Sequence, residues 1–277
     1  MGLRINTNVA ALTAQKSLAN TNDAQARSIS KLATGSRIVR AADDAAGLAI
    51  SEHLKAKIRG VRQAERNAND GISMIQTAEG GLNETSSILT RLRELAIQTS
   101  SDTLGDTERQ LTDLEFQSLK SEIERISNVT EFNGKRLLNG VGGVYDLQVG
   151  VGNDDKLDRI KYDASDSDAT LTGLGITSLR VDNKADSWES LEVLDHAITN
   201  VSGQRANLGA AQNRLASTVR NLQTFIENLS AANSRIRDTD FADEVSNNAR
   251  LNILLNAGVS VLTQANSNGS QALRLLS

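Results

Sequence analysis

Few residues in this sequence have the type and spacing that catalysis or metal binding requires. The two histidines, His53 and His196, each stand inside a stretch of helical periodicity, and neither has a partner at the spacing of an HExxH motif. The chain has no cysteine, so a zinc site would need carboxylates at a spacing that we do not find. We interpret both histidines as residues on solvated helix faces. The sequence therefore predicts no enzyme activity, no metal and no cofactor.

Two acidic clusters could bind cations or act as acids and bases, but each has a simpler structural interpretation. Asp43-Asp44 immediately precedes an alanine-rich stretch, where carboxylates accept the free amide hydrogens of a first helical turn. Asn153-Asp154-Asp155 with Asp158 could hold calcium weakly, yet the spacing differs from that of an EF-hand and a tight turn accounts for these residue types. An enzyme with a cryptic site around this turn remains an alternative.

The composition indicates long helices. The 277 residues include no proline, the strongest helix breaker, and only 3% aromatic residues, so Leu, Ile, Val and Ala must supply the core. Thirty basic and thirty-four acidic residues are mixed along the chain and give a net charge of −4, which argues against nucleic acid as a partner. No run of about eighteen apolar residues occurs, so we expect no membrane span. The N-terminus shows neither the apolar core nor the cleavage site of a signal peptide.

Three segments show the repeat of a coiled coil, in which apolar residues recur at alternating intervals of three and four. In the longest, only Arg205, Gln212 and Asn233 interrupt the apolar seam. Such helices cover their apolar faces by packing together, so we predict a mainly α fold, an elongated antiparallel helical bundle or coiled coil built from both chain ends. The seams lie in residues 54–82, 116–126 and 191–236.

Local signals within these segments predict where helices begin and where the repeat is disturbed. The apolar pattern changes phase across Gly80-Gly81, as a three-residue stammer or a local bend would produce. Thr107 with Gln110 has the spacing of a capping box, and Asp186 with Glu189 makes a suitable start for the last bundle helix.

The middle of the chain, residues 140–186, has a different character. Apolar residues alternate with polar residues or glycine over residues 145–151, which is the period of a β-strand. A turn-forming stretch follows at 152–155, and the alternation resumes at 160–162. We predict a small β-hairpin insertion that joins long helices.

The two chain ends are predicted to be incomplete on their own. Val9 and Leu12 belong to a thin apolar stripe among Asn, Ser and Thr residues, and no charged residue occurs from Leu251 through Leu273. Because apolar residues lie on several sides of that C-terminal helix, one amphipathic contact cannot cover it. We expect both ends to become ordered only among neighbouring copies. The expected subunit–subunit contacts are Ile5, Val9, Leu12, Leu251, Leu254, Leu255, Val261 and Leu262.

Motifs at both ends, taken in their order, carry a family resemblance. They include Ile5-Asn6-Thr7-Asn8, Leu32-Ala33-Thr34-Gly35-Ser36-Arg37-Ile38, Asp43-Asp44-Ala45-Ala46-Gly47-Leu48, Arg93-Glu94-Leu95-Ala96, Phe132-Asn133-Gly134, Gln212-Asn213-Arg214-Leu215 and Ser260-Val261-Leu262-Thr263-Gln264-Ala265-Asn266. With these motifs the chain resembles the bacterial flagellins over about residues 1–140 and 190–277. The missing middle is typical of that family.

The resemblance implies a structural subunit that polymerises into the flagellar filament used for swimming. It implies a terminal coiled-coil domain, residues 1–41 plus 239–277, that forms the inner tube. It also implies a helical bundle domain, residues 42–140 plus 187–238, with residues 141–186 as its outward-facing hairpin tip. Ser267-Asn268-Gly269-Ser270 stands where the family often has a Val-Pro pair, which leaves the path of the last residues open.

The resemblance further implies partners and a location outside the cell. The expected partners are other copies of the chain, an export chaperone, the filament cap and the hook-associated junction proteins. Export would follow the flagellar type III route without a cleaved signal peptide. A minor axial component, such as a hook–filament junction protein, and a secreted receptor-binding module that does not polymerise remain alternatives.

In flagellins of this type a Toll-like innate receptor binds an Arg, a Leu and a Glu on two neighbouring helices. The matching positions in this sequence are Arg91, Leu95 and Glu115. Helical spacing of four places Arg91 and Leu95 on one face. A buried seam position remains the alternative for Leu95.

Overall fold

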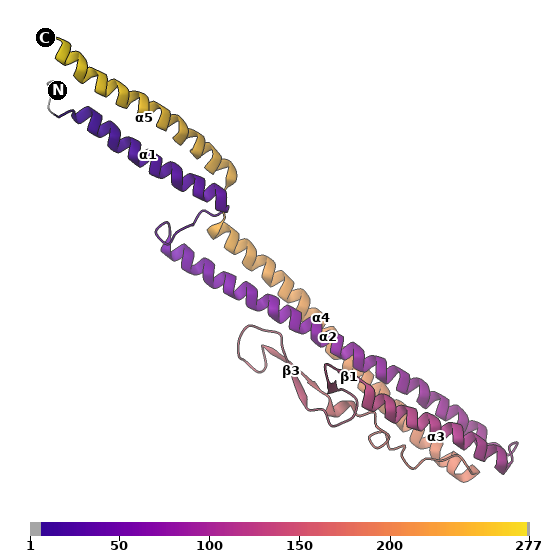
Figure 1. Ribbon diagram of the computed structural model, residues 1–277. Coiled ribbons are helices and arrows are strands. Elements are labelled where there is room, and N and C mark those ends of the chain that lie inside the picture. Colours follow the sequence, from indigo (N-terminus) through magenta and orange to yellow (C-terminus); the bar gives the residue numbers. More distant parts are fainter. Residues whose placement is uncertain (1–6, 276–277) are drawn as a thin grey trace. The chain divides into compact units, whose positions relative to one another are not determined.

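The structure is a computed structural model that describes residues 7–275, with side chains through Ser267, and its described part is mainly helical (Figure 1). The chain forms two compact units. We call Met1–Ala56 with Asn228–Ser277 the terminal unit and Lys57–Glu227 the bundle unit. The elements are α1 (Val9–Thr34), α2 (Ala45–Thr99), α3 (Asp106–Val129), β1 (Glu131–Phe132), β2 (Lys135–Arg136), β3 (Val144–Gln148), β4 (Arg159–Asp163), a 3-10 turn (Ser165–Ser167), α4 (Lys184–Arg237) and α5 (Phe241–Leu275).

This architecture confirms the predicted mainly α fold with a small β insertion. Helices α2 and α4 each contribute one part to each unit. The predicted terminal domain, residues 1–41 with 239–277, falls inside the terminal unit, and its boundaries stay a prediction. Among the described helices, none combines the length and the apolar character needed to cross a membrane.

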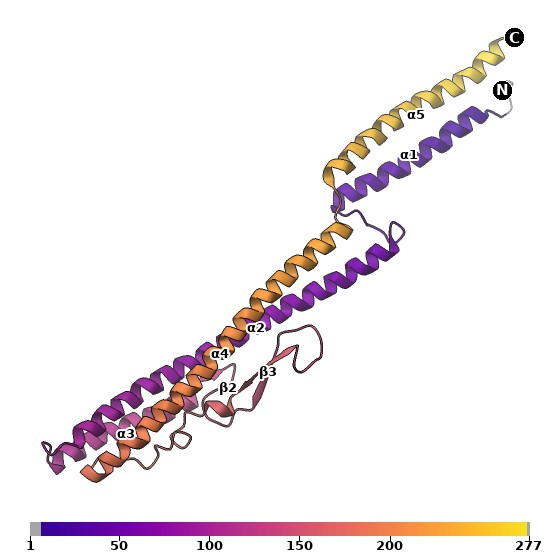
Figure 2. The ribbon, with the colours of Figure 1, turned by 180° about the vertical axis from the view of Figure 1, so that it is seen from behind.

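In the terminal unit, α1 and α5 lie side by side and run antiparallel (Figures 1 and 2). The Asn8 side chain caps α1 by accepting a hydrogen bond from the Ala11 amide at 3.0 Å, and α1 ends at Gly35 with φ at 66°. The Asp240 carboxylate accepts the Ala242 amide at 2.9 Å and so caps α5. Backbone of α5 remains helical to Leu275, so no break occurs at Gly269.

In the bundle unit, residues from all three predicted seams share one core. Every predicted seam position of α4 from Leu191 through Ile226 is buried or half-buried, including Arg205 and Gln212. The predicted α3 positions, Phe116 to Ile126, are buried or half-buried as well. Arg205 reaches the Glu79 carboxylate of α2 at 2.8 Å, so this polar seam pair joins α4 to α2.

The predicted change of phase at Gly80-Gly81 is wrong. Helix α2 is continuous, and its buried positions keep intervals of three and four through the glycine pair. Near the glycine pair, small or weakly polar residues such as Ala78 and Thr85 occupy buried positions of the repeat. A pattern that counts only large apolar residues therefore misses these positions. The fully buried series is Val61, Ala64, Ala68, Gly71, Ile75, Ala78, Leu82, Thr85, Leu89, Leu92, Ala96 and Thr99.

Both predicted helix starts are displaced. Helix α3 begins at Asp106 after Gly105, with no side-chain cap, so Thr107 does not serve as one. Helix α4 begins at Lys184, where the Asn183 side chain accepts the Asp186 amide at 2.8 Å. The capping residue is therefore the asparagine that precedes the predicted start.

The hairpin insertion is confirmed. Strands β3 and β4 pair antiparallel, with Tyr145 opposite Tyr162 and Leu147 opposite Ile160. The hairpin rests on α2, because Leu147 occupies the space that a side chain at Gly71 would need. The segment between β4 and α4 has little regular secondary structure but is densely packed: Ile176 and Val181 are fully buried, and Gln204 of α4 donates to the Asp168 carbonyl at 2.9 Å.

Candidate assembly site

The contact between α1 and α5 uses mainly small and polar side chains. On α1 the half-buried or buried positions recur at intervals of three and four, and a matching series on α5 faces them. Because few large apolar side chains take part, this helix pair buries little apolar surface within one chain. The series are Ala11, Ala14, Leu18, Thr21, Gln25, Ser28 and Leu32 on α1, and Asn248, Leu251, Leu255, Gly258, Leu262 and Ala265 on α5.

Polar side chains fix the register of this pair. The Asn8 amide donates to the Ala265 carbonyl at 2.8 Å near one end. Near the other end the Asn248 amide lies 3.5 Å from the Ser28 hydroxyl, and Gln25 is hydrogen-bonded to Asn252 between them. The pair is therefore specific in register without being tightly held by a core.

Large apolar side chains remain exposed on the outer surface of the same two helices. Successive residues of a helix are turned by about 100°, so the exposed positions of α5 point in several directions around its axis. A single further helix could not cover all of them. They are Val9, Leu12 and Ile29 on α1, and Phe241, Val245, Ile253, Leu254, Val259 and Val261 on α5.

The structure divides the predicted assembly residues into two groups. Val9, Leu12, Leu254 and Val261 are exposed, with Val261 at 58%. Leu251, at 7%, is buried, and Leu255 and Leu262 are half-buried in the seam with α1. Ile5 lies outside the described residues. The assembly role of these residues stays a prediction, and the expected contacts did not include the exposed Ile29, Val245, Ile253 and Val259.

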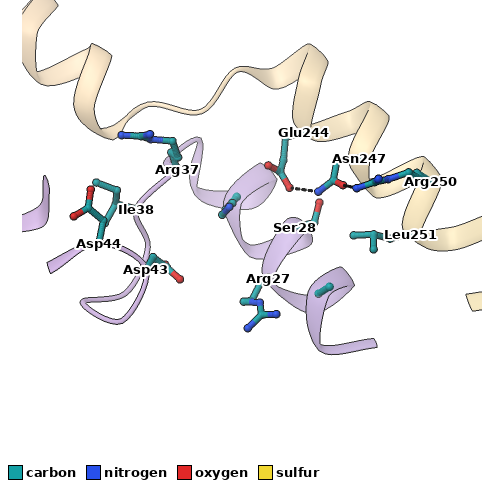
Figure 3. Close-up of a pocket in the computed structure, with 12 residues that line it drawn as sticks. Arg27, Ser28, Arg37, Ile38, Asp43, Asp44, Glu244, Asn247, Arg250 and Leu251 are labelled. Carbon is teal, nitrogen blue, oxygen red and sulfur yellow. Dashed lines mark hydrogen bonds between the residues drawn. The ribbon is translucent and has the colours of Figure 1, made fainter. Parts of the chain in front are cut away.

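A polar cavity of about 620 Å³ lies at the base of the α1–α5 pair (Figure 3). Figure 3 shows the Glu244, Asn247 and Arg250 side chains of α5 joined in a row of hydrogen bonds above it. The cavity is not lined by a cluster that could hold a metal, and no such cluster occurs within the described residues. The lining residues are Ala24, Arg27, Ser28, Lys31, Arg37, Ile38, Asp43, Asp44, Glu244, Asn247, Arg250 and Leu251.

The two adjacent aspartates that line this cavity accept backbone amide hydrogens. Asp43 accepts the amides of Val39 and Arg40 at 3.1 and 2.9 Å, and Asp44 accepts the Gly47 amide at 2.8 Å in the first turn of α2. The hydrogen bond from the Arg40 amide is the main cause of a lowered pKa of Asp43, and it outweighs desolvation. The capping interpretation is confirmed for Asp44, whereas Asp43 accepts amides of the preceding loop and not of α2.

The other candidate groups for chemistry also have structural roles. Asp158 accepts the amides of Gly152 and Asp154 at 3.1 and 3.0 Å, so the carboxylate closes the hairpin turn. His53 and His196 are exposed on helix surfaces, as expected.

The predicted receptor residues are brought together only in part. The Arg91 guanidinium contacts the Glu115 carboxylate at 2.9 Å and that of Glu94 at 3.1 Å. The hydrogen bond to Glu115, followed by that to Glu94, raises the pKa of Arg91. Both members of the Arg91–Glu115 pair are exposed, whereas Leu95 is 1% exposed and belongs to the core.

Comparison with known proteins places these surfaces in a family. The family model described as "Bacterial flagellin N-terminal helical region" matches residues 5–142, and the one described as "Bacterial flagellin C-terminal helical region" matches residues 191–276. A flagellin of Halalkalibacterium halodurans is 44% identical over an alignment that covers 98% of this chain and 99% of that protein. A flagellin of Bacillus subtilis is 42% identical, with 99% of this chain and 100% of that protein covered.

A solved structure agrees with the sequence relatives. The crystal structure of Bacillus cereus flagellin superimposes with a TM-score of 0.51 at 29% identity, covering 61% of this chain and 94% of that one. Both helical ends of the chain match the family, and the relatives extend the match over nearly its whole length. The chain therefore belongs to the bacterial flagellin family.

Proposed function

We propose that this chain, a structural subunit of the bacterial flagellar filament, polymerises by burying the exposed apolar side chains of α1 and α5 among neighbouring copies. The observation that supports the proposal is that the inner and outer faces of these helices carry different residues. Mainly small and polar residues, with a few leucines, join α1 to α5 within one chain, while Leu254 and Val261 are exposed. Burying a valine or leucine side chain contributes about 1.5–3 kcal/mol, so repeated contacts of this kind stabilise a polymer strongly.

Truncation tests this proposal. Deleting residues 251–277 removes most of the exposed apolar residues of α5 and leaves the bundle unit untouched. We expect the truncated protein to retain the helical circular dichroism of the bundle but to remain in the supernatant when the full chain is pelleted as filaments. Filaments of normal length from the truncated protein, seen by negative-stain microscopy, would contradict the proposal.

The same experiment separates the polymer from the alternative of a receptor-binding module that does not assemble. Purified full-length protein should sediment as fibres once polymerisation is induced by a precipitant. A protein that stays monomeric under every such condition would favour the receptor-binding module.

We also propose a location and a route of export. The chain would be secreted through the flagellar export channel with the help of a chaperone. The filament would then grow beneath its cap and beyond the hook-associated junction proteins.

We also propose that the Arg91–Glu115 pair contributes to recognition by a Toll-like innate receptor. The exposed ion pair holds both side chains in place at the surface of α2 and α3. Because Leu95 is buried, its role is to support Arg91 from below and not to contact the receptor. Changing Arg91 and Glu115 to Ala should lower receptor signalling by monomers, whereas the matched change of Glu122 and Arg125, another exposed ion pair of α3, should not. Equal signalling by both variants would refute this role.

A further inference from the structure

The bundle unit contains a groove with apolar walls and an open rim. The groove has a volume of about 320 Å³ and lies between the β3–β4 hairpin, α2 and α4. Leu157 is 81% exposed at its edge, and Val151 and Phe225 are exposed as well. We call it the hairpin groove and define it by its apolar lining residues Val61, Val149, Val151, Leu157, Ile160, Leu222 and Phe225.

The rim of the hairpin groove carries uncompensated positive charge. Lys156 and Arg214 line the groove, and within the described residues neither makes an ion pair. The Lys57 ammonium lies 5.1 Å from the centre of the Phe225 ring. The one carboxylate of the lining, Asp158, is occupied by backbone amides of the turn. The groove therefore favours an apolar ligand that carries negative charge.

The first half of α3 has the complementary character. Leu111 and Leu114 are 63% and 66% exposed, and they are among the most exposed leucines of the described helices. Residues 106–115 include four acidic side chains and one arginine. Glu108 is exposed and makes no ion pair within the described residues. Leu111 and Leu114 are three residues apart and therefore lie next to each other on the helix surface. An acidic helix with such a pair of leucines has the pattern of a helix that docks into an apolar groove.

We propose that Leu111 and Leu114 of one copy dock into the hairpin groove of a neighbouring copy. The proposal rests on the polymerisation proposed above and identifies a second contact for it, in the bundle unit. Figures 1 and 2 show the hairpin tip and the start of α3 well apart along this unit, so one copy cannot fill its own groove. The charge of the acidic α3 segment opposes that of Lys156 and Arg214 at the groove rim.

The geometry of this contact explains why it suits a filament. The two surfaces are different patches of the same chain, so the interface is heterologous. A heterologous contact whose rotation does not close a ring produces an open helical assembly. Each added copy brings one unused groove and one unused α3 surface, which leaves the growing assembly with a free site at each end.

Cysteine cross-linking of the full chain tests the proposal, because the natural sequence has no cysteine. Two single variants are prepared, Leu111→Cys and Leu157→Cys, together with Val141→Cys as a control that is 85% exposed and lies outside the groove. Filaments are grown from equal mixtures and treated with a short bis-maleimide. We expect a cross-linked dimer from the mixture of Leu111→Cys with Leu157→Cys, and no such dimer from the mixture of Leu111→Cys with Val141→Cys.

The alternatives give different results in the same experiment. Cross-linking of Leu111→Cys with itself would indicate a symmetric contact and overturn the proposal. Equal yields with Leu157→Cys and Val141→Cys in normal filaments would overturn it too, while leaving polymerisation through α1 and α5 intact. If the unmodified chain forms no filaments at all, the proposed function itself fails. Loss of the dimer when Lys156→Glu and Arg214→Glu are added to the groove copy would support the charge argument.

Discussion

Leu18 of α1 occupies the space that a side chain at Gly258 of α5 would need: a Cβ atom at position 258 would lie 2.8 Å from the Leu18 Cδ1 atom. This close contact, together with the hydrogen bonds on either side of it, sets the distance between α1 and α5. A glycine inside a helix costs about 1 kcal/mol relative to alanine, so its presence here is explained by the neighbouring helix and not by helix stability.

Substitution of Gly258 should separate the terminal helices. Gly258→Leu places a large side chain against Leu18, and overpacking of this kind costs roughly 1–3 kcal/mol. Ala257→Leu adds similar bulk one residue earlier, on the exposed side of α5. We expect hydrogen-exchange protection of α1 and α5 amides in the monomer to fall in the first variant and to stay unchanged in the second. Equal protection in both would show that the pair does not depend on this contact.

The adjacent glycines of α2 should respond to alanine with opposite signs. A Cβ at Gly81 would lie 2.6 Å from Leu138 Cδ1 and 2.8 Å from Thr130 Oγ1, whereas a Cβ at Gly80 meets nothing within 4 Å. Gly80→Ala should raise the free energy of unfolding by up to about 1 kcal/mol through helix propensity. Gly81→Ala should lower it by roughly 1–3 kcal/mol through overpacking. Urea unfolding of the two variants tests the prediction, and a stabilising Gly81→Ala would contradict it.

Lys120 should be a strong point of attachment for the segment that follows the hairpin. Lys120 is only 4% exposed, and its ammonium donates to the Gln117 side-chain oxygen at 3.1 Å and to the carbonyls of Thr177 and Leu179 at 2.8 Å. Lys120→Met leaves the Gln117 side-chain oxygen and the Thr177 carbonyl without this donor, whereas the Leu179 carbonyl keeps the hydrogen bond from the Gln117 amide at 3.1 Å. The loss should cost roughly 1–3 kcal/mol. Arg62→Met, at an exposed position of α2, is the control. Fluorescence of the one tryptophan, Trp188, reports unfolding of the bundle unit. Indistinguishable midpoints would refute the role of Lys120.

Acid should weaken the connection between α1 and α2. The pKa of Asp43 is lowered below its ordinary value of 3.8, first by the hydrogen bond from the Arg40 amide. Since the folded-state pKa is the lower one, the stabilisation is fully present above the unfolded value and is lost as pH falls through the folded value. The Val39 and Arg40 amide resonances should therefore shift together with an apparent pKa below 3.8. A midpoint at or above that value, or no shift, would contradict the assignment.

The sequence predicted the seams of the bundle unit well because their large apolar residues are also its buried residues. Leu194, Val201, Leu208 and Leu215 were placed correctly by spacing alone. The same reasoning failed at Gly80-Gly81, because the repeat continues there through Ala78 and Thr85, which an apolar pattern does not count. Small residues such as these can be identified as buried contact positions only when the position of the neighbouring helix is known.

The candidate assembly site could be located from the sequence but not resolved into its two faces. The unusual composition of residues 251–273 identified the right helix. It could not show that Leu251 pairs with α1 while Val261 faces solvent, because the α1 side of that seam consists of residues such as Thr21 and Ser28, which carry no apolar signal. For Leu95, the family match and the seam pattern gave different predictions, and its burial agrees with the seam.

Polymerisation through α5 requires its outer residues to be open to solvent in the single chain and covered in the polymer. Single cysteines at Val261 and Leu251 can report this, because the chain has no other thiol. The rate of reaction with a charged, water-soluble maleimide should be high for Val261→Cys in the monomer and should fall sharply in the filament. Leu251→Cys should react slowly in both states. A Val261→Cys rate that is the same before and after polymerisation would contradict the central claim.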